Sequence, residues 1–323
     1  MALNEFGLVN RFFTHQAVKN PLTRLGVGDD CALLAVPDGF QLAVTADTLV
    51  EGVHFFPGAD PESLGQKALA VNLSDLAAMG AKPHWAILAL TVPKVDEVWL
   101  EAFSRGLLEL AARFGVQLIG GDTTKGPLAI TIQAMGVVPA GKAMLRSAAE
   151  AGDIVYVTGF LGDAGLGLQI ERGYAAGDGE QALARFHRPT PRIEEGIAIA
   201  NVAAACLDIS DGLLADLGHI LDASGVGARV DWDWLPLSPA VLRYIQETGD
   251  WRLPLRAGDD YELCFTVRPD HESELKNIVQ SLNVPCTSIG VIEKGEGLRF
   301  IRSGKLTDIA AMGYEHFSLP EGA

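Results

Sequence analysis

The hydrophobic positions in the first half of the chain follow two patterns that alternate along the sequence. Short apolar runs of strand length are separated by longer segments in which apolar residues recur at steps of three and four. The longer segments predict helices over 62–79 and 97–114. The apolar runs predict strands at 41–47, 84–92, 116–121 and 128–138.

The segment 97–114 carries the clearest helix signals. Its apolar positions lie on one helical face: Trp99, Phe103, Leu107, Leu110 and Phe114. Asp96 stands where an N-cap residue is needed, and Gly115 stands where a left-handed C-cap residue is favoured. We expect this apolar face to belong to the hydrophobic core.

The polar, glycine-containing stretch that follows residue 138 interrupts this pattern and predicts a domain boundary near residue 140. A chain of 323 residues is long for one core, so we expect domains at 1–140 and 141–323. The second half predicts helices near 163–174, 192–204 and 212–223, an exposed loop or short helix at 175–191, and strands at 153–159, 262–267, 286–293 and 298–302. This mixed order indicates an α+β fold.

The charge balance limits the possible partners. The chain has 25 Lys and Arg against 41 Asp and Glu, a formal net charge of −16. This acidity argues against direct electrostatic binding of nucleic acid or of an anionic membrane, so an anionic ligand needs bridging cations. The absence of a long unbroken apolar run and of an apolar signal core predicts a cytoplasmic protein.

The four cysteines lie far apart without a CxxC pair, so they suggest neither a zinc knuckle nor a disulfide scaffold: Cys31, Cys206, Cys264 and Cys286. The chain also lacks the P-loop lysine motif, HExxH and GxSxG. The glycines of 156–170 miss the GxGxxG spacing, so they predict a tight turn at a helix start rather than a dinucleotide site.

Carboxylates recur where apolar runs end, next to Gly, Ser or Thr. The six stretches are GVGDD at 26–30, VTADT at 44–48, NLSDL at 72–76, IGGDTT at 119–124, DISDG at 208–212 and AGDDYE at 257–262. A single Asp in such a place is usually a turn residue or a helix cap, but six repetitions favour a shared cation site. Oxygen ligands that do not follow the EF-hand spacing favour Mg²⁺.

A polar pair lies on an otherwise apolar helix face. Asn72 and Asp75 are three residues apart in the predicted helix 62–79 and share its face with Ala68 and Met79. A buried carboxylate without a partner costs several kcal/mol, so we expect another polar element to meet this face.

Seven segments, taken in order along nearly the whole chain, resemble the thiamine-monophosphate kinase family. They are GVGDDCALL, TADTLVEGVHF, KALAVNLSDLAAMGAKP, QLIGGDTTKGPL, GDIVYVTG, DISDGLLADLGHI and AGDDYELCFTV, and the closing GYEHF also matches. The wider group is that of aminoimidazole ribonucleotide synthetase-like ATP enzymes. The resemblance implies an N-terminal domain with a mixed sheet and helices for ATP, Mg²⁺ and dimerisation, and a C-terminal α/β sandwich-like domain that completes the ATP and substrate sites.

The resemblance also implies the reaction, a Mg²⁺-dependent transfer of the γ-phosphoryl group of ATP to thiamine monophosphate by a homodimer. Carried over by position, the metal ligands would be Asp30, Thr45, Ala46, Asp47, Asp75, Asp122, Asp208 and Asp211. The ATP contacts would be Gly121, Asp122, Arg146 and Ser210, and the substrate contacts would be His54, Asp259 and Tyr314.

Two positions depart from the family pattern. Ala46 stands where the family often has Thr, so it can ligate only through its backbone carbonyl. Asp259 stands where relatives commonly carry Glu, so substrate contact can be direct, pass through water, or fall to Asp260. Among the other candidates, Arg146 suits either an ATP phosphate or a surface ion pair, and His54 suits either substrate or a structural role.

The expected chemistry needs no nucleophile from the protein. The acceptor is a phosphate monoester whose second pKa is about 6, so it is largely ionised at neutral pH. Repulsion between two unit charges 4 Å apart costs about 4 kcal/mol at an effective dielectric of about 20, which Mg²⁺ would offset. We therefore expect direct in-line transfer. The alternatives are a synthetase of the same superfamily that forms a phosphorylated intermediate, and a non-catalytic nucleotide or metal sensor.

Overall fold

A computed structural model describes residues 5–307 and 309 of the chain. The chain divides into two compact units between Ala143 and Met144, and each unit has its own sheet. Within the described residues, no helix is both long enough and apolar enough to cross a membrane.

The first unit is built on a four-stranded mixed sheet with the order β3-β6-β4-β5. The strands are β3 (Phe40–Val50), β6 (Ala129–Pro139), β4 (Lys82–Val92) and β5 (Gln117–Lys125). Strand β6 is antiparallel to both of its neighbours, whereas β4 and β5 are parallel. The connection between β4 and β5 therefore crosses over through a helix, α3 (Glu97–Phe114).

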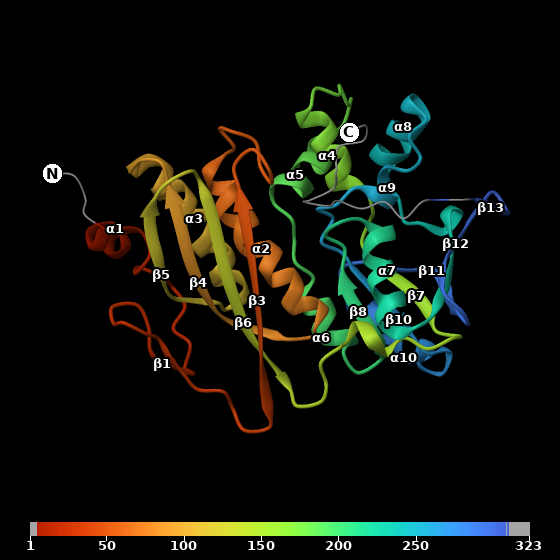
Figure 1. Cartoon of the computed structure of the whole chain (residues 1–323), viewed down its shortest axis with the longest axis horizontal. Helices are drawn as coiled ribbons and strands as arrows, with labels where there is room; N and C mark the ends of the chain where they lie inside the picture. Colours follow the sequence, from red (N-terminus) through yellow and green to blue (C-terminus); the bar gives the residue numbers. More distant parts are fainter. Residues whose placement is uncertain (1–4, 308, 310–323) are drawn as a thin grey trace, which may run out of the picture. The chain divides into compact units, whose positions relative to one another are not determined.

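Helices α2 (Pro61–Ala78) and α3 pack against each other and cover one face of this sheet (Figure 1). On the other face, residues 20–36 contribute the short strands β1 (Thr23–Leu25) and β2 (Leu33–Leu34), and Leu34 packs against buried Trp85 and Met135. Helix α1 (Glu5–Phe12) precedes them.

The predicted limits of α3 are confirmed, and so are its caps. The Asp96 side chain accepts a hydrogen bond from the Trp99 amide at 3.2 Å. Gly115 adopts the left-handed conformation, with φ of 68°, and its amide closes the last turn. Of the expected face, Phe103, Leu107 and Leu110 are buried.

The second unit contains a seven-stranded sheet with the order β13-β12-β9-β11-β7-β10-β8. All neighbours are antiparallel except β9 and β12. The strands are β7 (Ile154–Thr158), β8 (Ala203–Asp208), β9 (Gly227–Asp231), β10 (Leu263–Val267), β11 (Cys286–Glu293), β12 (Gly297–Arg302) and β13 (Lys305–Thr307). The helices are α4 (Asp163–Glu171), α5 (Glu180–His187), α6 (Ile193–Ile199), α7 (Leu213–Ser224), α8 (Pro239–Thr248), α9 (Leu253–Arg256) and α10 (Glu272–Gln280). The apolar side chains of α7 pack into the main core of this unit.

One predicted helix is wrong in its second half. Helix α6 ends at Ile199, and the last residues of the predicted 192–204 helix begin strand β8. The run of alanines at 203–205 favours a helix locally, but pairing with β10 places it in the sheet. The other predicted elements of this half are present, and 175–191 contains the short helix α5. The fold is α+β, as expected.

Candidate active site

The polar pair on α2 meets strand β3. The buried Asn72 side chain accepts a hydrogen bond from the Asp47 amide at 3.0 Å and donates one to the Ala68 carbonyl at 3.1 Å. The Thr45 hydroxyl donates to the Asp75 carboxylate. The expectation that a polar element meets this helix face is therefore confirmed, and the contact brings together three predicted metal ligands: Thr45, Asp47 and Asp75.

A second group of predicted residues borders a cleft of about 1320 Å³ in the first unit. Asp30, Gly121 and Asp122 line it together with apolar side chains that include Phe13 and Met135. The neighbouring Asp29 acts as a turn residue, because its carboxylate accepts a hydrogen bond from the Asp30 amide at 2.9 Å. The side chains of Asp30 and Asp122 are exposed. The cleft therefore combines apolar walls with carboxylates that a cation can reach.

Gly121 allows the two parallel strands to lie close together. Its φ is 151°, and a Cβ added to it would lie 1.8 Å from the carbonyl oxygen of Leu88 on β4. The strand register places Asp47, Ile132, Leu88 and Gly121 on one row across the sheet. At about 4.8 Å per strand, Asp47 and Gly121 lie roughly 14 Å apart. The first unit thus carries two separate groups of predicted ligands, one that includes residues of β3 and one that includes residues of β5.

The second unit brings its own predicted residues together. Asp208 ends β8, Ser210 and Asp211 follow in the turn to α7, and Asp259 lies in the loop before β10. Backbone bonds join the two segments, since the Asp259 amide donates to the Ser210 carbonyl at 2.9 Å. Residues that are about fifty positions apart in the chain therefore form one edge of this unit.

Asp216 is a residue of this edge that the sequence reasoning missed. Its buried carboxylate accepts hydrogen bonds from the amides of Asp211, at 2.9 Å, and Gly212, at 3.0 Å. Burial raises the pKa of Asp216 to about 7. This side chain fixes the turn that carries Asp211. Its position in the first turn of α7, shortly after the DISDG motif, is the sequence signal that could have revealed it.

The structure distinguishes Asp259 from Asp260. Asp259 is half-buried and its carboxylate accepts a hydrogen bond from the Tyr261 hydroxyl at 3.1 Å. Asp260 is only 1% exposed, and its carboxylate accepts the amides of Gly162, at 2.7 Å, and Ala164, at 3.2 Å. Burial raises the pKa of Asp260 to about 8. Of the two, only Asp259 is placed to reach a ligand.

The same contact excludes a dinucleotide site at α4. A pyrophosphate would use the amides at the start of this helix, and the Asp260 carboxylate already occupies two of them. Gly162 has a positive φ of 85° at the helix N-cap. The glycines of 156–170 therefore form a tight turn at a helix start, as predicted.

Arg146, His54 and Tyr314 are the remaining predicted site residues. Arg146 is exposed in a short 3₁₀ turn (Arg146–Ala148) and forms no ion pair with any described residue. His54 Nδ1 accepts a hydrogen bond from the Val50 amide at 3.0 Å, which places the proton of the neutral ring on Nε2. Tyr314 lies outside the described residues.

Comparison with known proteins shows which family the chain belongs to. Residues 28–138 match the N-terminal domain of AIR synthase related proteins, and residues 150–303 match the C-terminal domain. The thiamine-monophosphate kinase of Haemophilus influenzae is 48% identical over 324 residues, which is 98% of this chain and 99% of that protein. The chain belongs to the thiamine-monophosphate kinase family.

Solved structures of the thiamine-monophosphate kinase family share this fold. The crystal structure of thiamine-monophosphate kinase from Stenotrophomonas maltophilia has a TM-score of 0.82 and 45% identity, and covers 89% of this chain and 93% of its own. A 32% identical relative, with a TM-score of 0.78, was solved in complex with AMPPCP and TMP, and the match covers 88% of this chain and 89% of the relative.

The donor atoms of this thiamine-monophosphate kinase family member suit Mg²⁺. No three His, Cys, Asp or Glu side chains gather into a ready metal site within 5–307 and 309. Mg²⁺ usually binds one or two carboxylates together with water and substrate phosphates, so it needs no such cage. Asp30 and Asp122, which line one cleft, and Asp75 with the Thr45 hydroxyl offer donors of this kind. Ala46 lies beside Thr45 on the edge strand β3, where only its carbonyl can serve as a ligand.

Proposed function

We propose that the protein transfers the γ-phosphoryl group of ATP to thiamine monophosphate and releases thiamine diphosphate and ADP. The observation that carries this proposal is the 48% identity to a thiamine-monophosphate kinase across almost the whole of both chains. The relative solved with AMPPCP and TMP supports the same pair of substrates. The protein is accordingly an ATP-dependent phosphotransferase.

The predicted residues are assigned to three roles in this reaction. Mg²⁺ is assigned to Asp30, Thr45, the Ala46 carbonyl, Asp47, Asp75, Asp122, Asp208 and Asp211. ATP is assigned to Gly121, Asp122, Arg146 and Ser210, and thiamine monophosphate to His54, Asp259 and Tyr314. When bound, Mg²⁺ supplies positive charge that offsets the repulsion between the two sets of phosphates.

The side chains hold and orient the two polyanions. Arg146 offers a planar fork of donors to an ATP phosphate, and its exposed head forms no ion pair with described residues. His54 offers the Nε2 proton as a donor, because Val50 holds Nδ1 as an acceptor. The Asp259 carboxylate suits the cationic thiazolium ring of the acceptor. The acceptor phosphate is itself the nucleophile, so the transfer is direct, without a phosphoenzyme.

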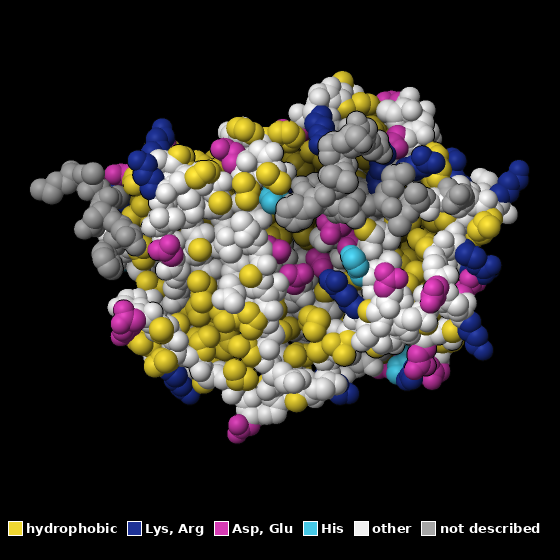
Figure 2. Space-filling view, in the orientation of Figure 1, with side chains coloured by type: hydrophobic (Ala, Val, Ile, Leu, Met, Phe, Trp, Pro, Cys, Tyr) yellow, Lys and Arg dark blue, Asp and Glu magenta, His cyan; other side chains and the backbone are white. Residues whose placement is uncertain are grey.

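A second copy of the chain is proposed to cover the exposed β3 part of the sheet face that lies opposite α2 and α3. Hydrophobic side chains gather over the visible face of this sheet (Figure 2). Phe40, Leu42 and Val44 alternate along edge strand β3 and are 41–51% exposed, with no charged residue between positions 40 and 46. An exposed apolar stretch of an edge strand that carries no charged residue favours pairing with another strand, here that of a second copy of the chain.

Light scattering on the eluting protein tests this association. The wild-type chain is expected to elute as a dimer, and Val44→Asp is expected to shift it to a monomer because the interface would bury an unpaired charge. A wild-type monomer at micromolar concentration would contradict the proposal.

The reaction itself is tested with purified protein, ATP, Mg²⁺ and thiamine monophosphate, with the products separated by chromatography. Thiamine diphosphate and ADP are expected in equal amounts, and inversion of a chiral γ-thiophosphate is expected for a direct transfer. A synthetase would instead form ADP only with another acceptor, and a sensor would form neither product. Folded protein that makes no thiamine diphosphate would refute the kinase assignment.

A further inference from the structure

The loop that carries Asp259 has an unusual backbone. Asp259 has φ of 68° and Tyr261 has φ of 49°, and these are two of the three non-glycine residues with positive φ among those described. Such a conformation is unfavourable for a residue with a side chain, so the surroundings must hold it. The backbone of this loop is bonded to the neighbouring turn, where the Tyr261 amide donates to the Ile209 carbonyl at 2.9 Å.

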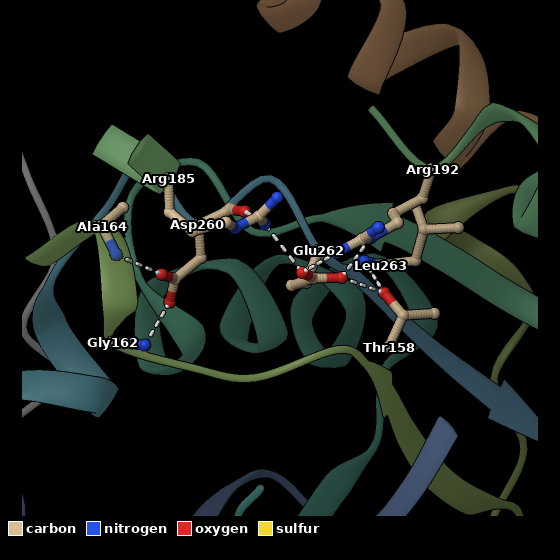
Figure 3. A network of polar contacts seen from close by, with 8 residues as sticks. All are labelled: Thr158, Gly162, Ala164, Arg185, Arg192, Asp260, Glu262 and Leu263. Carbon is tan, nitrogen blue, oxygen red and sulfur yellow. Dashed lines mark hydrogen bonds and ion pairs between the residues drawn. The ribbon is translucent and has the colours of Figure 1, made fainter. Parts of the chain in front are cut away.

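The two residues on either side of Tyr261 point into the protein. Asp260 and Glu262 are each 1% exposed. Figure 3 shows how Glu262 is held by side chains from three other segments. The Thr158 hydroxyl donates to it at 2.7 Å, Arg185 Nη2 donates at 2.7 Å, and Arg192 donates through Nε at 2.6 Å and Nη2 at 2.5 Å.

Arg185 also ties down the backbone of the loop. Its Nη2 atom donates to the Asp260 carbonyl oxygen at 2.7 Å as well as to Glu262 (Figure 3). The Asp260 side chain meanwhile bonds the first amides of α4. Gly159 makes room for this arrangement, because a Cβ there would lie 2.2 Å from Glu262 Oε1. The residues on both sides of Tyr261 are therefore held from inside the unit.

Stability alone does not explain these buried charges. Burying an Arg–carboxylate pair costs desolvation, and apolar residues of similar volume often stabilise a fold equally well. Such a cluster instead imposes one geometry, because a guanidinium fork fits a carboxylate in a single plane. The residues held in this way follow Asp259 directly in the chain. Their loop is hydrogen-bonded through its backbone to the segment that carries Ser210 and Asp211.

We propose that Glu262, Arg185 and Arg192 are positioning residues for substrate binding, and that they hold the strained loop 257–262 so that Asp259 faces thiamine monophosphate. The inference rests on the proposed function, which assigns Asp259 to that substrate. The two arginines lie in 175–191 and just after it, a stretch that the sequence indicated only as an exposed loop or short helix.

The contacts distinguish the two arginines. Arg192 binds Glu262 through Nε and Nη2, a two-point contact that the single ammonium of lysine cannot reproduce. Arg192→Lys is therefore expected to raise the KM for thiamine monophosphate about 10-fold. The kcat and the KM for ATP are expected to change less than about 3-fold. Arg185 makes both of its contacts through one nitrogen, so Arg185→Lys is expected to keep the KM within about 3-fold of wild type. Glu262→Gln, which keeps the shape of the side chain, is expected to behave like Arg192→Lys.

Arg299→Lys is the matched control. Arg299 also binds a glutamate, Glu293, through Nε and Nη2, but this pair is exposed and lies on β11 and β12. Arg299→Lys is expected to leave every kinetic constant unchanged. Thermal melting accompanies each variant, so that loss of fold is separated from loss of position.

Hydrogen exchange gives a readout that does not depend on turnover. Peptides that cover 257–263 are expected to exchange about 10-fold faster in Arg192→Lys than in wild type, with the rest of the second unit unchanged. If the wild type makes no thiamine diphosphate, the proposed function fails and the positioning role fails with it, whatever the exchange shows. In an active enzyme, unchanged exchange at 257–263, or equal rises in both KM values, would overturn the inference.

Discussion

Replacing Gly121 by alanine should separate strand β5 from strand β4. The new Cβ would lie 1.8 Å from the Leu88 carbonyl oxygen and 2.7 Å from its carbon. A carbon and an oxygen that are not bonded approach to about 3.3 Å, so the strands must part locally by roughly 1.5 Å. Both obstructing atoms belong to the backbone of a central strand, which cannot turn aside as a flexible side chain can.

The size of the effect follows from the contacts that are lost. Two ladder hydrogen bonds contribute about 1 kcal/mol each. An alanine forced towards positive φ adds about 1–2 kcal/mol. The total is about 3–4 kcal/mol, which corresponds to a fall in Tm of roughly 10 °C for a unit of this size. The affinity for ATP should fall as well, because Asp122 follows directly in the chain.

Gly120→Ala is the control. A Cβ at Gly120 would have nothing within 4 Å, and its φ is not positive. Thermal melting should therefore place this variant within about 1–2 °C of wild type. Calorimetric titration with a non-hydrolysable ATP analogue and Mg²⁺ completes the comparison. If Gly121→Ala melts with the wild type, or if both variants lose the same stability, the close approach of the two strands does not limit this position.

Three further changes test other parts of the molecule. Burial raises the pKa of Asp260 to about 8, whereas the unfolded value is about 3.9, so the folded protein keeps this carboxyl protonated and its stability should fall as pH rises through pH 4–8. Asp260→Asn should make the free energy of unfolding, measured by urea titration, depend less on pH. The same pH dependence in both proteins would contradict the raised pKa of Asp260. Asp75→Asn should lower kcat by a factor of about 10²–10³ with little change in Tm, and steady-state assays at high Mg²⁺ should show partial recovery of kcat. A wild-type kcat in this variant would show that Asp75 is not a metal ligand. Asp96→Ala removes the cap of α3 and should cost about 1 kcal/mol of stability in a denaturant titration without altering kcat. A fall in kcat would show that Asp96 does more than cap the helix.

Local signals in the sequence were enough where neighbours in the chain decide the structure. Asp96 and Gly115 limit α3 through hydrogen bonds that span only a few residues. The polar pair Asn72 and Asp75 predicted that a polar element would cover the helix, and β3 supplies the amide and hydroxyl that do so. Where local preference and long-range pairing disagreed, as in the alanines that open β8, the pairing prevailed.

The order of motifs along the sequence by itself determined the family, the α+β class and the residue types available for an oxygen-ligated cation. Tertiary structure decided which of two adjacent carboxylates can meet a ligand, because Asp260 points inward to the amides of α4 while Asp259 remains half-buried at the edge. It also decided what holds them, since Glu262, Arg185 and Arg192 meet only when segments about seventy residues apart fold together. Side-chain direction in an irregular loop depends on such distant partners, and no periodicity in the sequence records it.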